Sequence, residues 1–186
     1  LHLSNNNLTE NGLITENFKF VEELDISFNI LSKIPSDMFL SGSSLIIISL
    51  NSNRLNFIDS DAFNDLKVLK KLDLSKNLLN YLNDYTFYHL KNLEFLNLNN
   101  NLINYITVDI FKNLKSLQIL DLSHNKIIYI CDYSFKNLMY LKELYLNSNP
   151  FFTKINNSKK FTGLERIEKI YIHQNLIKAD NLFNIK

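Results

Sequence analysis

The side chains that could do chemistry are few and widely spaced. The sequence contains four histidines, His2, His89, His124 and His173. None belongs to an H-E-x-x-H zinc pattern, and neither G-x-S-x-G nor a phosphate-loop pattern occurs. The single cysteine, Cys131, has no second cysteine for a disulfide and no histidine nearby in sequence to activate it. The sequence therefore predicts no enzyme, no metal site and no cofactor.

Composition narrows the choice of partner. Apolar residues make up 46% of the chain and charged residues 21%, with a net charge of +1, which indicates a packed protein rather than a disordered one. A nearly neutral chain lacks the concentrated positive charge that nucleic-acid binding requires, so we expect no nucleic-acid partner. No run approaches the roughly 18 consecutive apolar residues of a membrane span, so we expect no membrane insertion of this segment.

The elements that must position any functional side chain are repeats. One template, exemplified by Leu72-Asp73-Leu74-Ser75-Lys76-Asn77, recurs eight times. Its copies start near residues 1, 24, 48, 72, 96, 120, 144 and 170. We therefore expect residues 1–186 to form a single domain of about eight repeats. Because terminal repeats normally carry polar caps and none is evident, both ends are expected to be cut from a longer protein.

The repeats identify a family resemblance. The pattern L-x-x-L-x-L-x-x-N-x-L is met in full by Leu69, Leu72, Leu74, Asn77 and Leu79. With its 24-residue period, the chain resembles the typical extracellular subclass of leucine-rich repeat proteins, as found in Toll-like receptors, chaoptin-like adhesion proteins and Slit-type ectodomains. The resemblance implies an α/β solenoid, a curved right-handed coil with a parallel β-sheet on its concave face and loops or short helical turns on its convex face.

Two further columns of residues are expected to hold the repeats together. An asparagine at each turn offers a donor and an acceptor to backbone groups of the neighbouring turn. This predicted asparagine ladder comprises Asn29, Asn53, Asn77, Asn101, Asn125, Asn149 and Asn175. A phenylalanine that recurs on the convex side forms the second column, which comprises Phe39, Phe63, Phe87, Phe111, Phe135 and Phe161. Both columns are structural in this interpretation.

Three departures from the repeat pattern carry expectations of their own. Thr15 stands where later repeats carry the column phenylalanine. Gly42 replaces a leucine of the later repeats, so convex packing should be thin there. Two extra residues precede Phe161, after an Asn149-Pro150-Phe151 sequence that often opens a cysteine-bearing cap in this family; no cysteine follows. We expect a bulge at that point and then a further repeat.

Outward positions of the strands are the first candidate for binding, because inward positions are committed to packing. These positions mix apolar, aromatic and short polar side chains, as protein-recognition surfaces do. The candidate residues on the concave face are Ile47, Lys71, Asp73, Phe95, Ile119, Asp121, Tyr145, Tyr171 and His173. A generic solvated sheet face is the competing interpretation.

A row of aromatic residues on one flank is the second candidate. Phe57, Tyr81, Tyr105 and Tyr129 recur at the repeat period, with Lys33 and Lys154 at the two ends of the row. Stacking between repeats would explain such a row as well as a binding role would. We expect it either to stabilise the solenoid or to serve as a partner or homodimer surface.

The resemblance implies a non-catalytic protein-binding module from the ectodomain of a cell-surface receptor or adhesion protein, with a protein ligand or co-receptor as its partner. Two sequons, at Asn7 and Asn156, agree with an extracellular glycoprotein. The main alternative is an intracellular or secreted scaffold or effector without receptor signalling, which would allow a cytoplasmic location. Homophilic adhesion is a third interpretation.

Overall fold

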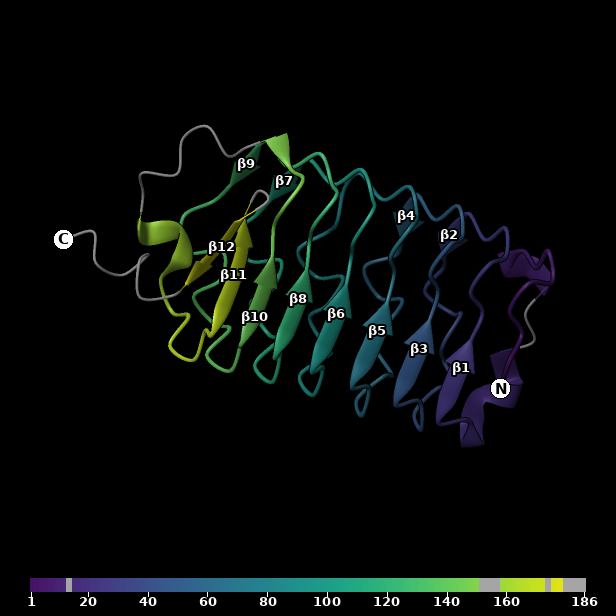
Figure 1. The fold of residues 1–186 in the computed structure, drawn as a ribbon. Coiled ribbons are helices and arrows are strands. Elements are labelled where there is room, and N and C mark those ends of the chain that lie inside the picture. Colours follow the sequence, from purple (N-terminus) through teal and green to yellow (C-terminus); the bar gives the residue numbers. More distant parts are fainter. Residues whose placement is uncertain (13–14, 151–157, 173–174, 179–186) are drawn as a thin grey trace.

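In the computed structural model, which describes residues 1–12, 15–150, 158–172 and 175–178, the chain coils into stacked turns (Figure 1). Each turn contributes one short strand to a single eight-stranded sheet. In spatial order the strands are β1 (Glu23–Asp25), β3 (Ile47–Ser49), β5 (Lys71–Asp73), β6 (Phe95–Asn97), β8 (Ile119–Asp121), β10 (Glu143–Tyr145), β11 (Lys169–Ile172) and β12 (Asn175–Lys178). Strands β1 to β11 pair in parallel, which confirms the predicted sheet.

Alternation along each strand fixes its two faces. In β5 the middle residue, Leu72, is fully buried, whereas Lys71 is exposed and Asp73 is half-buried. The register places Leu72 opposite Leu96, and Leu96 opposite Leu120, so the inward leucines form a continuous column. Side chains alternate across a strand, and the sheet therefore presents the residues on either side of each leucine to solvent.

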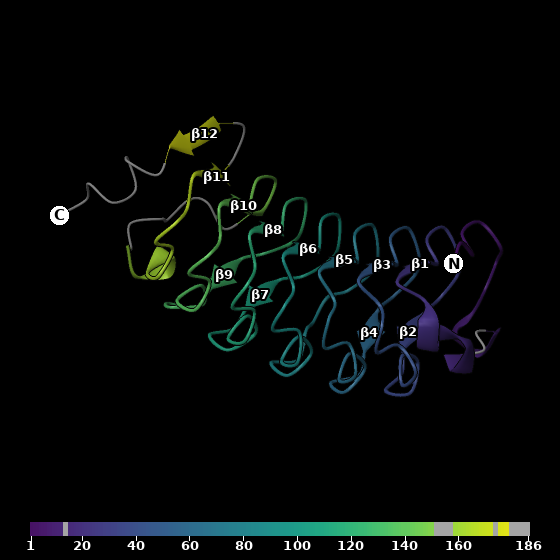
Figure 2. The same ribbon diagram turned by 90° about the horizontal axis from the view of Figure 1, so that it is seen from below.

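The side of the solenoid away from this sheet is built from turns (Figure 2). Four two-residue strands line one flank: β2 (Lys33–Ile34), β4 (Phe57–Ile58), β7 (Tyr105–Ile106) and β9 (Tyr129–Ile130). They pair only as β2 with β4 and as β7 with β9 among the described residues. The 3-10 helices are η1 (Glu10–Gly12), η2 (Thr15–Phe20) and η4 (Ser158–Phe161). The described residues contain no α-helix, so the short helical turns are of the tighter type.

Buried asparagines join each turn to the one before it. The Nδ2 group of Asn101 donates to the carbonyl oxygen of Leu74 at 3.0 Å and to that of Leu98 at 3.1 Å. Its Oδ1 accepts a hydrogen bond from the backbone N–H of Leu79 at 3.0 Å. Equivalent bonds recur at Asn29, Asn53, Asn77, Asn125 and Asn149. Each asparagine thereby satisfies backbone groups that the turn would otherwise leave unpaired in the core.

The residue before each ladder asparagine has a left-handed backbone. The φ angles at this position lie between 52° and 57°, and the residues are Phe28, Ser52, Lys76, Asn100, His124 and Ser148. Most L-residues avoid this region, and asparagine is among the few that enter it readily. The sharp turn after each strand therefore has a backbone cost, which the ladder hydrogen bonds offset.

The phenylalanine column stacks along the interior and includes one residue that the sequence pattern missed. Phe39 and Phe63 have ring centroids 5.9 Å apart, and Phe135 and Phe161 are 6.2 Å apart despite the two-residue insertion. At the N-terminal end, Phe18 is buried and lies 6.4 Å from Phe39. Phe18 therefore begins the column, and the first repeat lacks no phenylalanine although Thr15 holds the position that the spacing indicated.

The expectation of thin packing at Gly42 is wrong. Gly42 is buried, and a Cβ atom added there would lie 2.7 Å from the Cδ1 of Leu45 and 3.0 Å from the Cδ2 of Leu66. The neighbouring leucines have closed the space that a leucine at residue 42 would fill. A side chain at residue 42 would therefore require these leucines to shift.

The last strand departs from the repeat. β12 pairs with β11 in the antiparallel direction, with Asn175 opposite Ile172 and Ile177 opposite Ile170. β11 is the parallel strand of the further repeat that the sequence analysis expected, but Asn175, which was placed in the asparagine ladder, begins a returning strand instead. An antiparallel return after two residues is geometrically ordinary, whereas a parallel strand would need a full crossover. β12 therefore covers the edge of β11.

Candidate functional site

The concave face, defined here as the outward side of β1 to β11, carries two rows of side chains. The first row holds Glu23, Ile47, Lys71, Phe95, Ile119, Glu143 and Lys169. The second holds Asp25, Ser49, Asp73, Asn97, Asp121, Tyr145 and Tyr171. Every predicted concave residue except His173, which lies outside the described residues, takes a place in one of these rows.

Apolar residues of the first row fall into two groups. Phe95 of β6 and Ile119 of β8 are direct register partners, and both side chains are half-buried. Ile47 is separated from Phe95 by the exposed Lys71. The structure therefore brings Phe95 and Ile119 together as one apolar surface and leaves Ile47 apart from them.

A polar and aromatic cluster fills the C-terminal end of the concave face. The rings of Tyr145 and Tyr171 stack with centroids 4.3 Å apart and planes 3° from parallel. The Tyr145 hydroxyl donates to Glu143 Oε2 at 2.6 Å, and the Lys169 ammonium donates to Glu143 Oε1 at 2.8 Å. Both tyrosines are half-buried, and three hydrogen-bonding groups hold them in one position.

These contacts shift the pKa values of three side chains in the cluster. The hydrogen bond from Lys169, helped by that from Tyr145, holds the pKa of Glu143 below its ordinary value. The same hydrogen bond raises the pKa of Lys169. Burial, together with the bond to the Glu143 carboxylate, raises the pKa of Tyr145. Glu143 is therefore ionised, and Lys169 and Tyr145 are protonated, throughout the neutral range.

The carboxylates of the second row have a structural task that the sequence analysis did not assign. Asp121 Oδ1 accepts hydrogen bonds from the backbone N–H and the hydroxyl of Ser123, at 2.8 and 2.6 Å. Asp73 Oδ1 accepts the backbone N–H of Ser75 at 2.9 Å. Such bonds two residues along the chain stabilise the turn that ends each strand. The recurring D-x-S spacing is the sequence signal for this role.

The flank row of aromatic residues divides into two pairs. Tyr105 and Tyr129 stack with centroids 5.3 Å apart, in register between β7 and β9. Among the described residues, neither Phe57 nor Tyr105 makes a ring contact with Tyr81. The Tyr105 hydroxyl lies 2.9 Å from the Sγ of Cys131, and this hydrogen bond raises the pKa of Tyr105. Cys131 thus contacts the stacked pair.

A lysine that the sequence analysis did not single out covers the end of the stacked pair. The Nζ of Lys160 lies 4.7 Å from the centroid of the Tyr129 ring. It donates to the carbonyl oxygen of Ile130 at 2.5 Å and lies 3.4 Å from Asp132 Oδ1. Lys154, which was expected at this end, lies outside the described residues. Lys160 belongs to η4.

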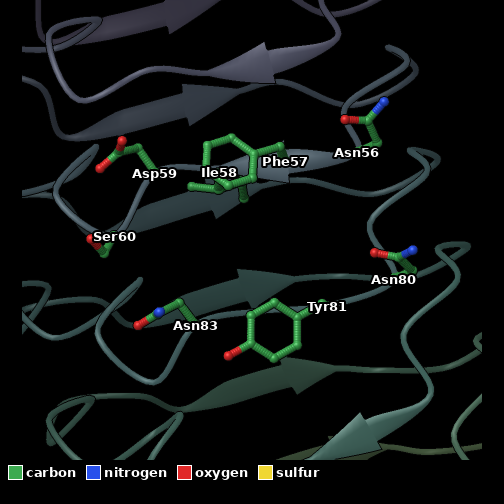
Figure 3. A pocket seen from close by; sticks show the side chains of 8 residues that line it. All are labelled: Asn56, Phe57, Ile58, Asp59, Ser60, Asn80, Tyr81 and Asn83. Atoms are coloured by element: carbon green, nitrogen blue, oxygen red, sulfur yellow. The ribbon is translucent and has the colours of Figure 1, made fainter.

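The other pair borders an open pocket of about 240 Å³. The rings of Phe57 and Tyr81 come from adjacent turns and lie on opposite sides of it (Figure 3). Its remaining lining residues are Asn56, Ile58, Asp59, Ser60, Asn80 and Asn83. Phe57 and Tyr81 are 54% and 66% exposed, so this pair presents its rings to solvent.

One of the two predicted glycosylation sites lies among the described residues. Asn7 is exposed and its sequon is accessible in the first turn, whereas Asn156 lies outside the described residues. Within the described ranges, no three histidine, cysteine, aspartate or glutamate side chains gather as metal ligands would. His124 stands at the left-handed turn position described above.

Comparison with protein families shows what kind of chain this is. The model of the leucine-rich repeat matches residues 21–79, 47–103, 69–127 and 96–151, which together cover more than half of the sequence. The chain belongs to the leucine-rich repeat family. No individually curated protein sequence matches it significantly.

Among solved structures, the chain is similar to the Toll–Spatzle complex of Drosophila, with 27% identity, a TM-score of 0.74 and 84% of this chain covered. It is also similar to the TLR13–ssRNA13 complex, with 28% identity, a TM-score of 0.62 and 81% covered. It spans 25% and 24% of the length of those two chains. Both neighbours are Toll-type proteins in complex with a ligand, and the fold of this chain is similar to a segment of each.

Across the residues that the structure describes, no helix has the length and hydropathy that crossing a bilayer requires. The concave face and the flank row remain the two candidate sites.

Proposed function

We propose that this chain is a non-catalytic protein-binding segment of a receptor or adhesion ectodomain, and that its partner docks on the concave face. The observation that carries the proposal is the apolar surface of Phe95 and Ile119 on β6 and β8, next to the stacked Tyr145 and Tyr171 on β10 and β11. Partly exposed aromatic and aliphatic groups on a rigid sheet are the side chains that dominate protein interfaces.

The rigidity of this surface supports binding without rearrangement. Each strand between β1 and β11 is paired with its neighbours, and Glu143, which is itself bonded to Lys169, accepts a hydrogen bond from Tyr145 of the stack. A partner that docks on such a surface orders few additional side chains, which lowers the entropic cost of association. Residues 1–186 are treated in this proposal as one continuous solenoid.

Charge on the concave face favours a protein over a nucleic acid. The two rows contain five carboxylates, Glu23, Asp25, Asp73, Asp121 and Glu143, against two ammonium groups, Lys71 and Lys169. A surface that tracks a phosphate backbone needs the opposite balance. We therefore place a protein ligand or co-receptor on this face, although the similar TLR13 structure holds a single-stranded RNA.

The same proposal assigns a location. Similarity to Toll and TLR13 ectodomains supports an extracellular or endosomal-lumen setting, and the accessible Asn7 sequon agrees with it. Glycopeptide mass spectrometry on the protein secreted from eukaryotic cells tests this part. We expect a glycan at Asn7; a bare Asn7 together with retention of the untagged full-length protein in the cytosol would favour the intracellular scaffold.

A binding selection tests the docking surface. The chain is used as bait against a displayed library of secreted proteins from the same source, and each selected partner is titrated against variants. We expect Phe95→Ala and Ile119→Ala each to weaken binding about tenfold or more, as loss of a central apolar anchor does. Leu40→Ala is the matched control, since Leu40 is 63% exposed and follows Phe39 on the convex side.

The outcomes separate the alternatives. Partners that ignore Phe95→Ala and Ile119→Ala would refute the concave docking surface. Saturable binding of single-stranded RNA at physiological salt, with no protein partner, would replace the protein ligand with a nucleic acid. Both results are distinguishable from misfolding because far-UV circular dichroism reports the sheet of each variant.

A further inference from the structure

The flank pocket differs from the stacked pair of Tyr105 and Tyr129 in its backbone as well as its rings. At two joints of the flank, the carbonyl of the residue after the row residue accepts a hydrogen bond from the next turn: Ile34 from the N–H of Asp59, and Ile106 from that of Cys131, both at 2.9 Å. In the described part of the chain, neither the carbonyl of Ile58 nor that of Leu82 accepts such a bond from the next turn. The backbone hydrogen bonds that join neighbouring turns on this flank are therefore interrupted where the pocket lies.

The same chain shows what fills an open position of this kind. At the end of the row, the Lys160 ammonium donates to the carbonyl of Ile130. That ammonium also lies over the Tyr129 ring and beside the carboxylate of Asp132. The Lys160 side chain is only 13% exposed, so these three groups hold a largely buried cation.

The pocket presents the same three groups without a cation of its own chain. Phe57 and Tyr81 occupy the row positions equivalent to Tyr129, since 57, 81, 105 and 129 differ by 24. Ile58 corresponds to Ile130 and carries the open carbonyl, and Asp59, whose Oδ1 accepts the backbone N–H of Asp61 at 3.0 Å, is a lining residue beside it (Figure 3). The pocket offers two aromatic rings, whereas Lys160 contacts one.

Nearby positive charge does not fill the pocket. Lys33, the register partner of Phe57, belongs to β2 on the side of Phe57 away from Tyr81. It interacts there with Glu10, whose pKa it helps to lower, although burial of Glu10 acts in the opposite direction. Among the described lining residues, Asp59 carries the formal charge, so the pocket is complementary to a cation.

We propose that the pocket between Phe57 and Tyr81 binds a lysine side chain of a partner protein. The ammonium lies against the rings, donates to the carbonyl of Ile58 and pairs with Asp59, as Lys160 contacts a ring, a carbonyl and a carboxylate at Tyr129. This site is separate from the concave face and does not depend on it, so a partner could engage both or either. The long stem of lysine suits a pocket whose walls are aromatic.

Nuclear magnetic resonance titration with a defined peptide tests the proposal. The probe is acetyl-Gly-Lys-Gly-amide, added to protein that is labelled in its phenylalanine and tyrosine rings. We expect saturable shifts at Phe57 and Tyr81, and none with the same peptide carrying Nε-acetyl-lysine, because acetylation removes the charge. Equal shifts with both peptides would show a merely apolar pocket and overturn the proposal.

Single substitutions test which residues of the pocket contact the lysine of the peptide. Asp59→Asn and Tyr81→Leu should each weaken the peptide by roughly 2- to 30-fold, the range of a cation–aromatic or charged contact. Asp61→Asn is the matched control, since it removes the same charge from a carboxylate that accepts the Asn64 side-chain amide and does not line the pocket. If Asp61→Asn weakened binding as much as Asp59→Asn, the effect would be diffuse charge and the pocket assignment would fail.

A second variant supplies a positive control within the chain. Lys160→Met empties the cation position at Tyr129, so the peptide should then also shift the Tyr129 signals. Shifts at Tyr129 in that variant, with none at Phe57 and Tyr81, would overturn the proposal. Sedimentation velocity separates the sources of the lysine: a dimer that forms in wild-type protein and dissociates in Asp59→Asn would mean that a second copy of this chain is the occupant.

Discussion

At the scale of single residues, the ladder asparagines carry more hydrogen bonds than any other side chains in a turn. Asn101 is 3% exposed and uses its amide group on both its own turn and the preceding one. Alanine at this position would leave the Leu79 N–H in the core without a partner, and the carbonyls of Leu74 and Leu98 would each lose one of their two donors. Each unsatisfied buried group costs free energy comparable to a lost hydrogen bond or more.

We therefore expect Asn101→Ala to lower the free energy of unfolding by about 3 kcal/mol. Asn104→Ala is the control, because Asn104 is exposed and makes no side-chain hydrogen bond among the described residues; it should change stability by less than about 0.5 kcal/mol. Urea unfolding followed by circular dichroism measures both. Equal losses in the two variants would show that the ladder is not what stabilises the turns.

The left-handed position before each ladder residue gives a second prediction at this scale. Lys76 has a φ of 52°, and the equivalent position of the next turn is Asn100. We expect Lys76→Asn to keep or slightly raise stability and Lys76→Val to lower it by about 1 kcal/mol, since a β-branched residue is strained at positive φ. The comparison is made by thermal and urea unfolding. A more stable valine variant would contradict the turn geometry.

At the scale of elements, the contact between β10 and β11 depends on pH. The pKa of Glu143 is lowered in the folded protein by Lys169 and Tyr145, so its contribution to stability is present above the unfolded value of about 4.3 and is lost as pH falls through the folded value. The pKa of Lys169 is raised, so its contribution is present below about 10.4 and is lost at more alkaline pH.

The change that tests this dependence is Glu143→Gln. We expect wild-type protein to lose more stability than the variant between pH 6 and pH 3, because the variant has no carboxylate to protonate at this position. Lys169→Met should reduce the same acid loss, since it removes the partner that lowers the Glu143 pKa. Urea unfolding at several pH values gives the profiles; parallel curves for wild type and Glu143→Gln would count against the linkage.

At the scale of the whole molecule, each turn contacts its neighbours and cohesion passes from turn to turn. Phe87 stands near the middle of the phenylalanine column, 6.3 Å from Phe63 and fully buried. Replacing it by alanine removes a large core side chain, which costs about 3–5 kcal/mol. Because the loss lies between two halves of a solenoid, it should also weaken the coupling between them.

We expect Phe87→Ala to lower both the urea midpoint and the m-value, since the halves then unfold over different concentrations. Hydrogen exchange should show earlier opening on one side of residue 87 than on the other. Phe18→Ala, at the end of the column, is the comparison, because a terminal cavity leaves the central turns coupled. An unchanged m-value with a lowered midpoint would show that the solenoid unfolds as one unit even with the cavity.

Much of this architecture could be predicted from the sequence, because the same residue pattern in each repeat places the same positions in the core of each turn. The inward leucines, the strand of each turn and the parallel register all follow from the alternation and the 24-residue period. Positions where the repeat pattern changes were harder to predict from the sequence. The position of Phe18 and the returning strand β12 lie at the ends, where a residue has one neighbouring turn instead of two to define it.

The sequence by itself determined the coil, the identity of its core columns and the residues that face outward on the sheet. Only the tertiary structure decided which contacts are made by outward residues that share one repeat position. Tyr105 and Tyr129 stack under Lys160, while Phe57 and Tyr81 border an open pocket, although all four share one repeat position. The physical reason is that the repeat period fixes only where the backbone of each row residue lies. Whether two side chains touch depends on a few ångströms of separation between turns, and on residues from other parts of the chain, such as Lys160, that reach the site.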